Sequence, residues 1–219
     1  MKGGFGVVEI WGRITSSNVQ ALMWCIGELG LQYVRHDAGG IYGGTEDAAF
    51  LAMNPNGTIP VLKDIDLPPL WETGAMCRHL ATRYGRDSFW PSDMTGRANV
   101  DRWAEWAKLN VAMAFTVPVF WRLVRTPKAR HDKIAIRAAV EVLENKLEIA
   151  DEILAKHHFL AGENFTLADI QFGHILFRYY DIELQRAEFP NVRAYYNSLT
   201  ERPAYREHVM VSYDELRVD

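Results

Sequence analysis

The sequence predicts a small α/β domain followed by an all-helical domain. Glycine is concentrated in the first part of the chain, where 13 of the 16 glycines precede Arg86. Short apolar runs alternate with helical patterns before that point, and helical patterns alone follow it. The stretch between the two parts holds Gly85, Pro91 and Ser92 and has no helical periodicity, as is typical of an interdomain linker. We therefore expect a first domain at 1–85, a linker at 86–95 and a second domain at 96–219.

The first domain begins with a predicted strand at 7–11, a run rich in β-branched residues. A helix over 18–29 follows and ends at Gly30, a residue suited to the position just beyond a helix. Further along we expect strands at 31–34, 59–62 and 67–71, and helices at 45–53 and 73–84. This β-α-β-α-β-β-α order predicts a small mixed sheet with helices on its faces.

The second domain is predicted to be a helical bundle. One long helix carries an apolar seam at helical spacing, formed by Ile136, Val140, Leu143, Leu147, Ala150 and Leu154. Another helix begins at Thr166, because Asp169 three residues later completes a capping box and Phe165 with Ile170 occupies the positions of a hydrophobic staple.

Composition argues against several classes of function. A net charge of −4 gives no general attraction to nucleic acid. Cys25 and Cys77 lack the spacing of a zinc site or a redox motif, which argues against a metal and fits a reducing compartment. Residues 1–10 lack the apolar run of a secretory signal, and no run of about 18 apolar residues suggests a membrane span. We expect a cytoplasmic protein with neither membrane nor nucleic acid as a partner.

Three short motifs could carry chemistry. Ile59-Pro60 begins a strand and is either an edge-strand proline or a cis proline that leaves the Ile59 backbone free to pair with an extended peptide. Ser16-Ser17-Asn18 precedes a helix and either caps it or, with the helix N-terminus, stabilises a bound thiolate. Glu72-Thr73 also precedes a helix, where it is either a cap with an acidic neighbour or a site for the carboxylate and ammonium groups of a ligand.

The sequence around these motifs closely resembles the glutathione-binding half of cytosolic glutathione transferases. The resemblance lies in Asn54-Pro55-Asn56-Gly57-Thr58-Ile59-Pro60-Val61-Leu62 and Trp71-Glu72-Thr73-Gly74-Ala75-Met76. Ser16-Ser17-Asn18-Val19-Gln20 is similar to the bacterial, theta-, zeta- or nu-like branches that use serine or threonine. In the second domain, Thr166-Leu167-Ala168-Asp169 and Arg202-Pro203-Ala204 resemble the capped core helix and the closing helix of the family.

The resemblance implies a thioredoxin-like domain followed by an all-α domain, a homodimer, and glutathione as co-substrate. It places Ser16 at the glutathione sulfur, with Asn18 as the alternative. Ile59, held by Pro60, would pair with the cysteinyl backbone, while Glu72 and Thr73 would hold the γ-glutamyl ammonium and carboxylate.

One departure concerns the glycyl end of glutathione. Many members of the family bind it with Lys, His or Gln, but this chain has Ile41-Tyr42-Gly43-Gly44-Thr45 there. Thr45, Arg35 or the loop backbone are the candidates for that role.

The second substrate is expected beside the sulfur. Trp103, Trp106, Asn110 and Met113 share a helical face, which is typical of core packing. The functional alternative is a pocket for an apolar second substrate, lined by Met113, Phe115, Phe120 and Trp121.

The resemblance predicts an enzyme, a glutathione transferase in which the glutathione thiolate attacks a small electrophile. The alternatives are glutathione-dependent reduction of a disulfide or peroxide at the same site, and a non-catalytic binding module that kept the fold.

Overall fold

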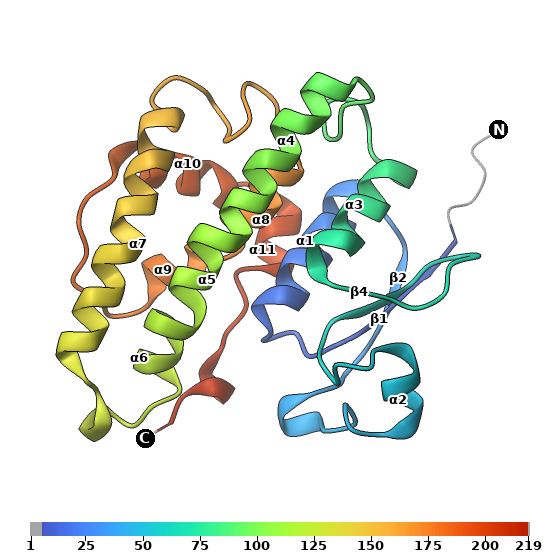
Figure 1. Ribbon diagram of the computed structural model, residues 1–219, viewed down its shortest axis with the longest axis horizontal. Helices are drawn as coiled ribbons and strands as arrows, with labels where there is room; N and C mark the ends of the chain where they lie inside the picture. Colours follow the sequence, from blue (N-terminus) through green and yellow to red (C-terminus); the bar gives the residue numbers. More distant parts are fainter. Residues whose placement is uncertain (1–5, 219) are drawn as a thin grey trace.

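The computed structural model describes residues 6–218, so the expectation about the N-terminal residues 1–10 lies partly outside the described chain. An α/β part lies to the right in Figure 1 and a helical part to the left. The α/β part runs β1 (Val8–Trp11), α1 (Ser17–Leu29), β2 (Tyr33–His36), α2 (Ala48–Met53), β3 (Val61–Lys63), β4 (Leu70–Trp71) and α3 (Thr73–Tyr84). The predicted order of elements is confirmed.

The sheet is mixed, with strand order β2-β1-β3-β4. β1 pairs parallel with β2 and antiparallel with β3, and β3 pairs antiparallel with β4. Successive strand residues point to opposite faces. Val8, Ile10 and Leu62 accordingly join the main core with α1 and α3, while Val61 joins Phe50 of α2 in a smaller cluster.

Several element boundaries differ from the predictions. β4 is confined to two residues because Pro68 and Pro69, which precede it, have no N–H groups to donate to a neighbouring strand. α2 begins at Ala48 rather than at 45, since Gly43 and Gly44 take positive φ angles and Asp47 is the residue that precedes the helix. β2 is shifted toward the C-terminus relative to the predicted 31–34.

A long helix opens the helical part and runs from Met94 to Val124. It comprises α4 (Met94–Trp106), α5 (Met113–Phe115) and α6 (Arg122–Val124), separated by π-helical segments at Ala107–Ala112 and Thr116–Trp121. Pro118, which has no N–H to donate, lies in the second π segment. By length and composition alone this helix could span a membrane. The core helix of a soluble protein meets the same two criteria, so they give weak support for a membrane span.

The remaining helices are α7 (Lys133–Leu154), α8 (Leu167–Gly173), α9 (Leu176–Asp181), α10 (Pro190–Thr200) and α11 (Pro203–His208). The predicted seam of α7 is buried from Ile136 to Ala150, with Leu154 partly buried against the same core. The capping box of α8 is confirmed, because Thr166 N donates to Asp169 Oδ2 at 2.8 Å and the Thr166 side chain accepts in return.

The two parts share one core. α1 packs against α8 and α11 of the helical part, and Trp24 of α1 is fully buried among their side chains. Arg202 reinforces this contact with two bonds to Glu28, at 2.7 Å and 2.5 Å. α1, which begins just after Ser16 and carries Asn18 in its first turn, is thereby held against helices that lie far away in the sequence.

Candidate functional site

Ser16 stands at the N-terminus of α1, and its side chain has no hydrogen-bond partner among residues 6–218. Its backbone is extended, with φ −80° and ψ 125°, and its hydroxyl makes no capping hydrogen bond. The backbone is fixed instead, since Ser16 N donates to the Arg13 carbonyl at 3.1 Å and the Ser16 carbonyl accepts from Gln20 N at 2.8 Å. The interpretation of Ser16 as a simple cap therefore does not apply, and a half-buried hydroxyl beside the helix N-terminus is available to a ligand.

Asn18 has a partner that sequence reasoning missed. Its Oδ1 accepts a hydrogen bond of 2.5 Å from Nζ of Lys108, which comes from the π segment after α4. Burial lowers the pKa of Lys108, and the charges of the Cys77 thiol, Glu72 and Glu105 oppose that shift. A cation from the helical part thus lies between the two candidate segments Ser16–Asn18 and Glu72-Thr73.

A signal for Lys108 was present in the sequence. It is the single charged residue between Glu105 and Arg122, in an otherwise apolar helical stretch. A lysine surrounded by apolar residues on a core helix needs a local reason to be there, because burying an ammonium group is costly.

Ile59-Pro60 lies beside the turn that carries Ser16. The peptide bond is cis, Pro60 is buried, and Ile59 is half-buried just ahead of β3. A Cβ added to Gly12, at the end of β1, would lie 3.4 Å from Cβ of Ile59, so the two backbones approach closely. Within the described residues, the backbone of Ile59 makes no hydrogen bond to another backbone group, which leaves it available to an extended peptide.

Glu72 and Thr73 lie at the N-terminus of α3, next to β4. Glu72 is exposed and has φ 70°, one of two positive values at non-glycine residues in the described chain. Such a conformation costs free energy and clusters at functional sites. Thr73 is buried as the first residue of α3, where free N–H groups of the helix attract a carboxylate.

The residues expected to bind the glycyl end of glutathione differ in whether their side chains already have partners. Arg35 is engaged, because Nη1 donates to the Gly12 carbonyl at 2.8 Å and pairs with Asp37. Thr45 is half-buried ahead of α2, and its methyl carbon would lie 3.4 Å from a Cβ placed on Gly39. Thr45 and the glycine loop therefore remain candidates, whereas Arg35 holds the β1 end in place.

Of the four residues predicted to line a second-substrate pocket, two are exposed and two are buried. Met113 is 58% exposed and Trp121 42% exposed, whereas Phe115 and Phe120 are almost fully buried. Phe115 packs on Tyr179 and Phe120 on Tyr213, with ring centroids 6.1 Å and 5.1 Å apart. Phe115 and Phe120 therefore form part of the core that supports the helix, and only Met113 and Trp121 present apolar surface.

Hydrogen bonds to residues of the C-terminal half hold the turn that carries Ser16. The Thr15 hydroxyl donates to Glu215, and the Thr15 carbonyl accepts from Nη2 of the buried Arg178 at 2.6 Å. Arg178 lies over the rings of Phe120 and Tyr213, at 4.8 Å and 5.6 Å from their centroids. Residues more than 160 positions away thus determine where Ser16 is placed.

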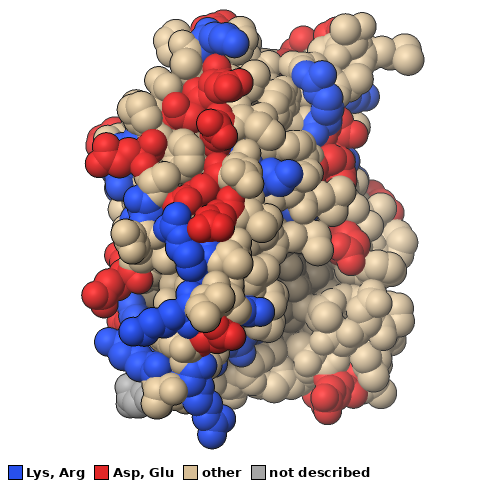
Figure 2. All heavy atoms as spheres, turned by 60° about the vertical axis from the view of Figure 1, so that its left-hand side comes forward, with Lys and Arg blue, Asp and Glu red and all other residues tan. Residues whose placement is uncertain are grey.

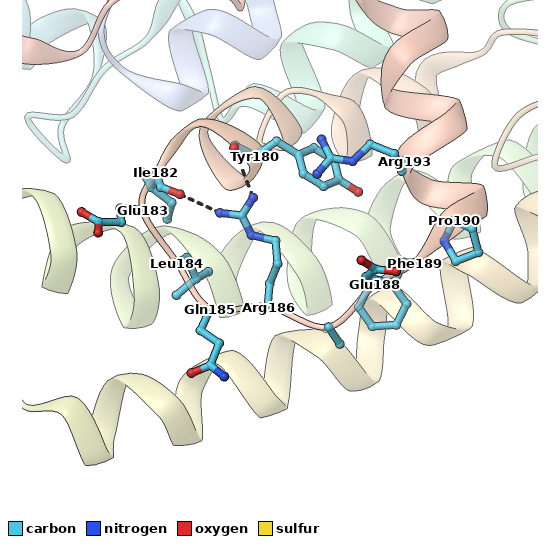
Figure 3. Close-up of a pocket in the computed structure, with 11 residues that line it drawn as sticks. Tyr180, Ile182, Glu183, Leu184, Gln185, Arg186, Glu188, Phe189, Pro190 and Arg193 are labelled. Carbon is cyan, nitrogen blue, oxygen red and sulfur yellow. Dashed lines mark hydrogen bonds between the residues drawn. The ribbon is translucent and has the colours of Figure 1, made fainter.

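A separate groove of about 890 Å³ lies between α9 and α10 (Figure 3). Arg186 spans it and donates to the carbonyls of Tyr180 at 3.1 Å and Ile182 at 2.6 Å, while Arg193 lies 3.6 Å from the centroid of the Tyr180 ring. These cations hold the connecting loop in place. The groove contains none of the predicted site residues.

The other candidate ligands are engaged locally. Cys25 and Cys77 are buried next to each other between α1 and α3, and the neighbouring thiol together with burial raises the pKa of Cys25. His157 and His158 are exposed and both pair with Glu163. Among residues 6–218, no group of three His, Cys, Asp or Glu side chains is arranged to hold a metal ion.

Comparison with known proteins identifies the family. The family model for the glutathione S-transferase N-terminal domain matches residues 15–83, and that for the C-terminal domain matches residues 111–203. Glutathione S-transferase GstB of Escherichia coli K12 is 35% identical over 206 residues, which cover 94% of this chain and 99% of the relative. Glutathione S-transferase F13 of Arabidopsis thaliana is 31% identical and covers 72% of this chain and 74% of its own.

A solved structure shares both the fold and the sequence. The theta class glutathione S-transferase of the citrus canker pathogen Xanthomonas axonopodis pv. citri, determined with glutathione bound, superposes with a TM-score of 0.88 at 38% identity. The match covers 94% of this chain and 98% of that one. The chain therefore belongs to the glutathione S-transferase family, with a thioredoxin-like N-terminal domain followed by the helical C-terminal domain.

Proposed function

We propose that the protein is a glutathione transferase that conjugates the glutathione thiolate to a small electrophile. The observation that carries this proposal is the uncommitted hydroxyl of Ser16 at the N-terminus of α1, beside the cis Ile59-Pro60 peptide. The relatives named as glutathione S-transferases and the glutathione-bound structural neighbour support glutathione as co-substrate.

The chemistry follows from the surroundings of Ser16. A thiol has an ordinary pKa of about 8.5 and reacts as the thiolate. The Ser16 hydroxyl, the helix N-terminus and the nearby Lys108 ammonium all favour the anion over the neutral thiol. Backbone pairing at Ile59 and the groups at Glu72 and Thr73 would hold the peptide so that its sulfur lies beside Ser16.

During conjugation the thiolate sulfur attacks the electrophilic carbon and forms a sulfur–carbon bond. The leaving group departs with its electron pair, or a double bond accepts the pair and is then protonated. The protein contributes positioning and a lower thiol pKa to this step.

Ser16→Ala tests this role. We expect the variant to bind glutathione, to raise the pKa of the bound thiol and to slow conjugation of 1-chloro-2,4-dinitrobenzene by about 10- to 100-fold. Asn18→Ala, measured in parallel, separates the two candidates at the sulfur. An unchanged pH–rate profile in Ser16→Ala with a shifted profile in Asn18→Ala would transfer the role to Asn18.

Glutathione-dependent disulfide reduction is the second candidate function. The disulfide-bond oxidoreductase YghU of Escherichia coli K12 is 28% identical over 197 residues and supports it. Calorimetric titration with reduced and then oxidised glutathione distinguishes the two, because a reductase is expected to bind the oxidised form and to turn over a glutathionyl disulfide. A non-catalytic module would do neither, and would also leave 1-chloro-2,4-dinitrobenzene unconjugated.

We further propose that the protein acts in the cytoplasm as a homodimer in detoxification, with a small electrophile that has an apolar body as substrate. Exposed apolar residues at Met113 and Trp121 support such a substrate. Sedimentation of the purified protein tests the dimer.

A further inference from the structure

Two arginines beside the candidate sulfur site have no role in the function proposed above. Arg13 lies three residues before Ser16, in the same turn, and its carbonyl accepts the hydrogen bond from Ser16 N. Arg125 follows α6 in the helical part and places its guanidinium 4.5 Å from the centroid of the Trp121 ring.

The Arg13 side chain is held close to the surface of the glycine loop. A Cβ placed on Gly40 would lie 3.1 Å from both Cδ and Nε of Arg13, so the absence of a side chain at Gly40 makes room for the guanidinium. Its Nε is buried and has no hydrogen-bond partner within residues 6–218. A buried donor without an acceptor is rare, and a ligand atom is one way to satisfy it.

The C-terminal segment passes both arginines, because Glu215 accepts from the Thr15 hydroxyl near Arg13, and Val218 N donates at 3.1 Å to the carbonyl of Val124, which precedes Arg125. Burial and then the charge of Arg125 lower the pKa of Arg13, and Glu215 opposes this shift. Neither arginine forms an ion pair with a carboxylate in the described chain, and Glu215 already accepts a hydrogen bond from Thr15. Arg178 adds a third guanidinium group to this region, since it is buried behind the same turn and donates to the Thr15 carbonyl at 2.6 Å.

The molecular surface agrees with this charge pattern. Figure 2 shows a hollow between the helical part and the lobe that includes α2, with Lys and Arg side chains gathered on the lower helical side. The stretch from the start of α6 to the start of α7 contains Arg122, Arg125, Lys128, Arg130 and Lys133 and a single acid, Asp132. This stretch is therefore locally basic, although the whole chain has a net charge of −4.

We propose that Arg13 and Arg125 form a subsite for a carboxylate on the electrophilic substrate, whose apolar body lies against Trp121. This inference rests on the proposed transferase function and specifies its substrate class. A carboxylate between two guanidinium groups relieves their repulsion and supplies an acceptor to the donor Nε of Arg13. The carboxylate does not react: the sulfur still attacks the electrophilic carbon, and the leaving group still takes the electron pair.

The test compares two electrophiles that differ in one charge, 4-(chloromethyl)benzoate and 4-(chloromethyl)benzamide. The wild-type protein is expected to prefer the benzoate in kcat/KM, after correction for the uncatalysed rates. Arg125→Gln and Arg13→Gln should reduce that preference by about tenfold or more, as expected for loss of a charge-assisted hydrogen bond. Arg130→Gln, which removes an exposed cation from the same basic stretch, is the matched control and should keep the preference.

Two results would overturn the inference while leaving conjugation intact. One is an equal kcat/KM for the two electrophiles in the wild-type protein. The other is a rise in KM for glutathione in both variants with an unchanged preference between electrophiles, which would assign the arginines to the glycyl carboxylate of glutathione instead.

A binding measurement keeps the subsite testable if neither electrophile is turned over, a result that would refute the proposed function. Calorimetry with the unreactive 4-methylbenzoate and 4-methylbenzamide should give tighter binding of the carboxylate, with the difference lost in Arg125→Gln. Equal affinities for the two compounds would refute the subsite.

Discussion

Replacing Lys108 with Met tests whether the helical domain tunes the chemistry of the other domain. Lys108 Nζ lies 2.5 Å from Asn18 Oδ1. A glutathione sulfur that is hydrogen-bonded to the Ser16–Asn18 segment would lie about 3.5 Å from its donor. The Lys108 ammonium would then lie about 6 Å from that sulfur. Its attraction for a thiolate is then about 0.7 kcal/mol in water and about 3 kcal/mol at an effective dielectric constant of about 20.

One pKa unit corresponds to about 1.4 kcal/mol, so Lys108→Met should raise the pKa of the bound thiol by about 0.5 to 2 units. Ultraviolet absorbance of the thiolate, followed against pH with glutathione bound, measures this shift directly. The rate of conjugation at pH 6.5 should fall accordingly. Lys108→Arg keeps the charge and Lys133→Met removes an exposed one, so both serve as controls. An unchanged thiol pKa in Lys108→Met would refute the proposed electrostatic role.

Three further predictions concern residues that support the site. Asp169→Ala should lower the free energy of unfolding, measured by urea titration, by about 3–5 kcal/mol. The reason is that Leu160 N, Thr166 N and the Tyr195 hydroxyl lose their acceptor. A loss below about 1 kcal/mol, as for an exposed helix cap, would contradict this prediction. Burial lowers the pKa of His174 to about 3, so the stability from its neutral form is complete above the unfolded value of about 6.5 and decreases as the pH falls toward 3. His174→Gln should therefore flatten the dependence of unfolding free energy on pH by about 3 kcal/mol between pH 7 and pH 4, and parallel curves for the two proteins would argue against this. Glu215→Ala removes the acceptor of the Thr15 hydroxyl and loosens the turn that carries Ser16. In steady-state kinetics kcat should therefore fall about tenfold with little change in glutathione affinity. Kinetics identical to the wild type would show that the Thr15–Glu215 bond does not position Ser16.

Local sequence signals predicted the parts of the fold that neighbouring residues govern. The capping box at Thr166 and Asp169 and the end of α1 at Gly30 depend on residues within a few positions of each other, and the structure contains both. Ile59-Pro60 could be read from its residues either as an edge-strand proline or as a cis proline. The resemblance to glutathione transferases favoured a backbone that binds a peptide, and the structure contains the cis bond. Boundaries near glycine loops and prolines, such as the start of α2, were less predictable because short-range pattern does not fix loop geometry.

The candidate site was predictable only on the side of the α/β domain. Ser16, Ile59 and Glu72-Thr73 each belong to a short motif, and these motifs can be recognised without knowledge of the fold. Lys108, Arg13 and Arg125 could not be assigned in this way, because their significance depends on contacts between segments about 90 or more residues apart. The same limit explains Phe115 and Phe120, which share a helix with Met113 and Trp121 yet face the core.

The sequence by itself determined the element order, the helix caps and the motifs of a glutathione-binding fold, since backbone propensities and capping act over a few residues. Only the tertiary structure decided which charges surround the turn at Ser16. Electrostatic interactions act through space, and the cations that gather there come from the first loop, the long helix of the second domain and α9. Their convergence depends on how the two domains pack.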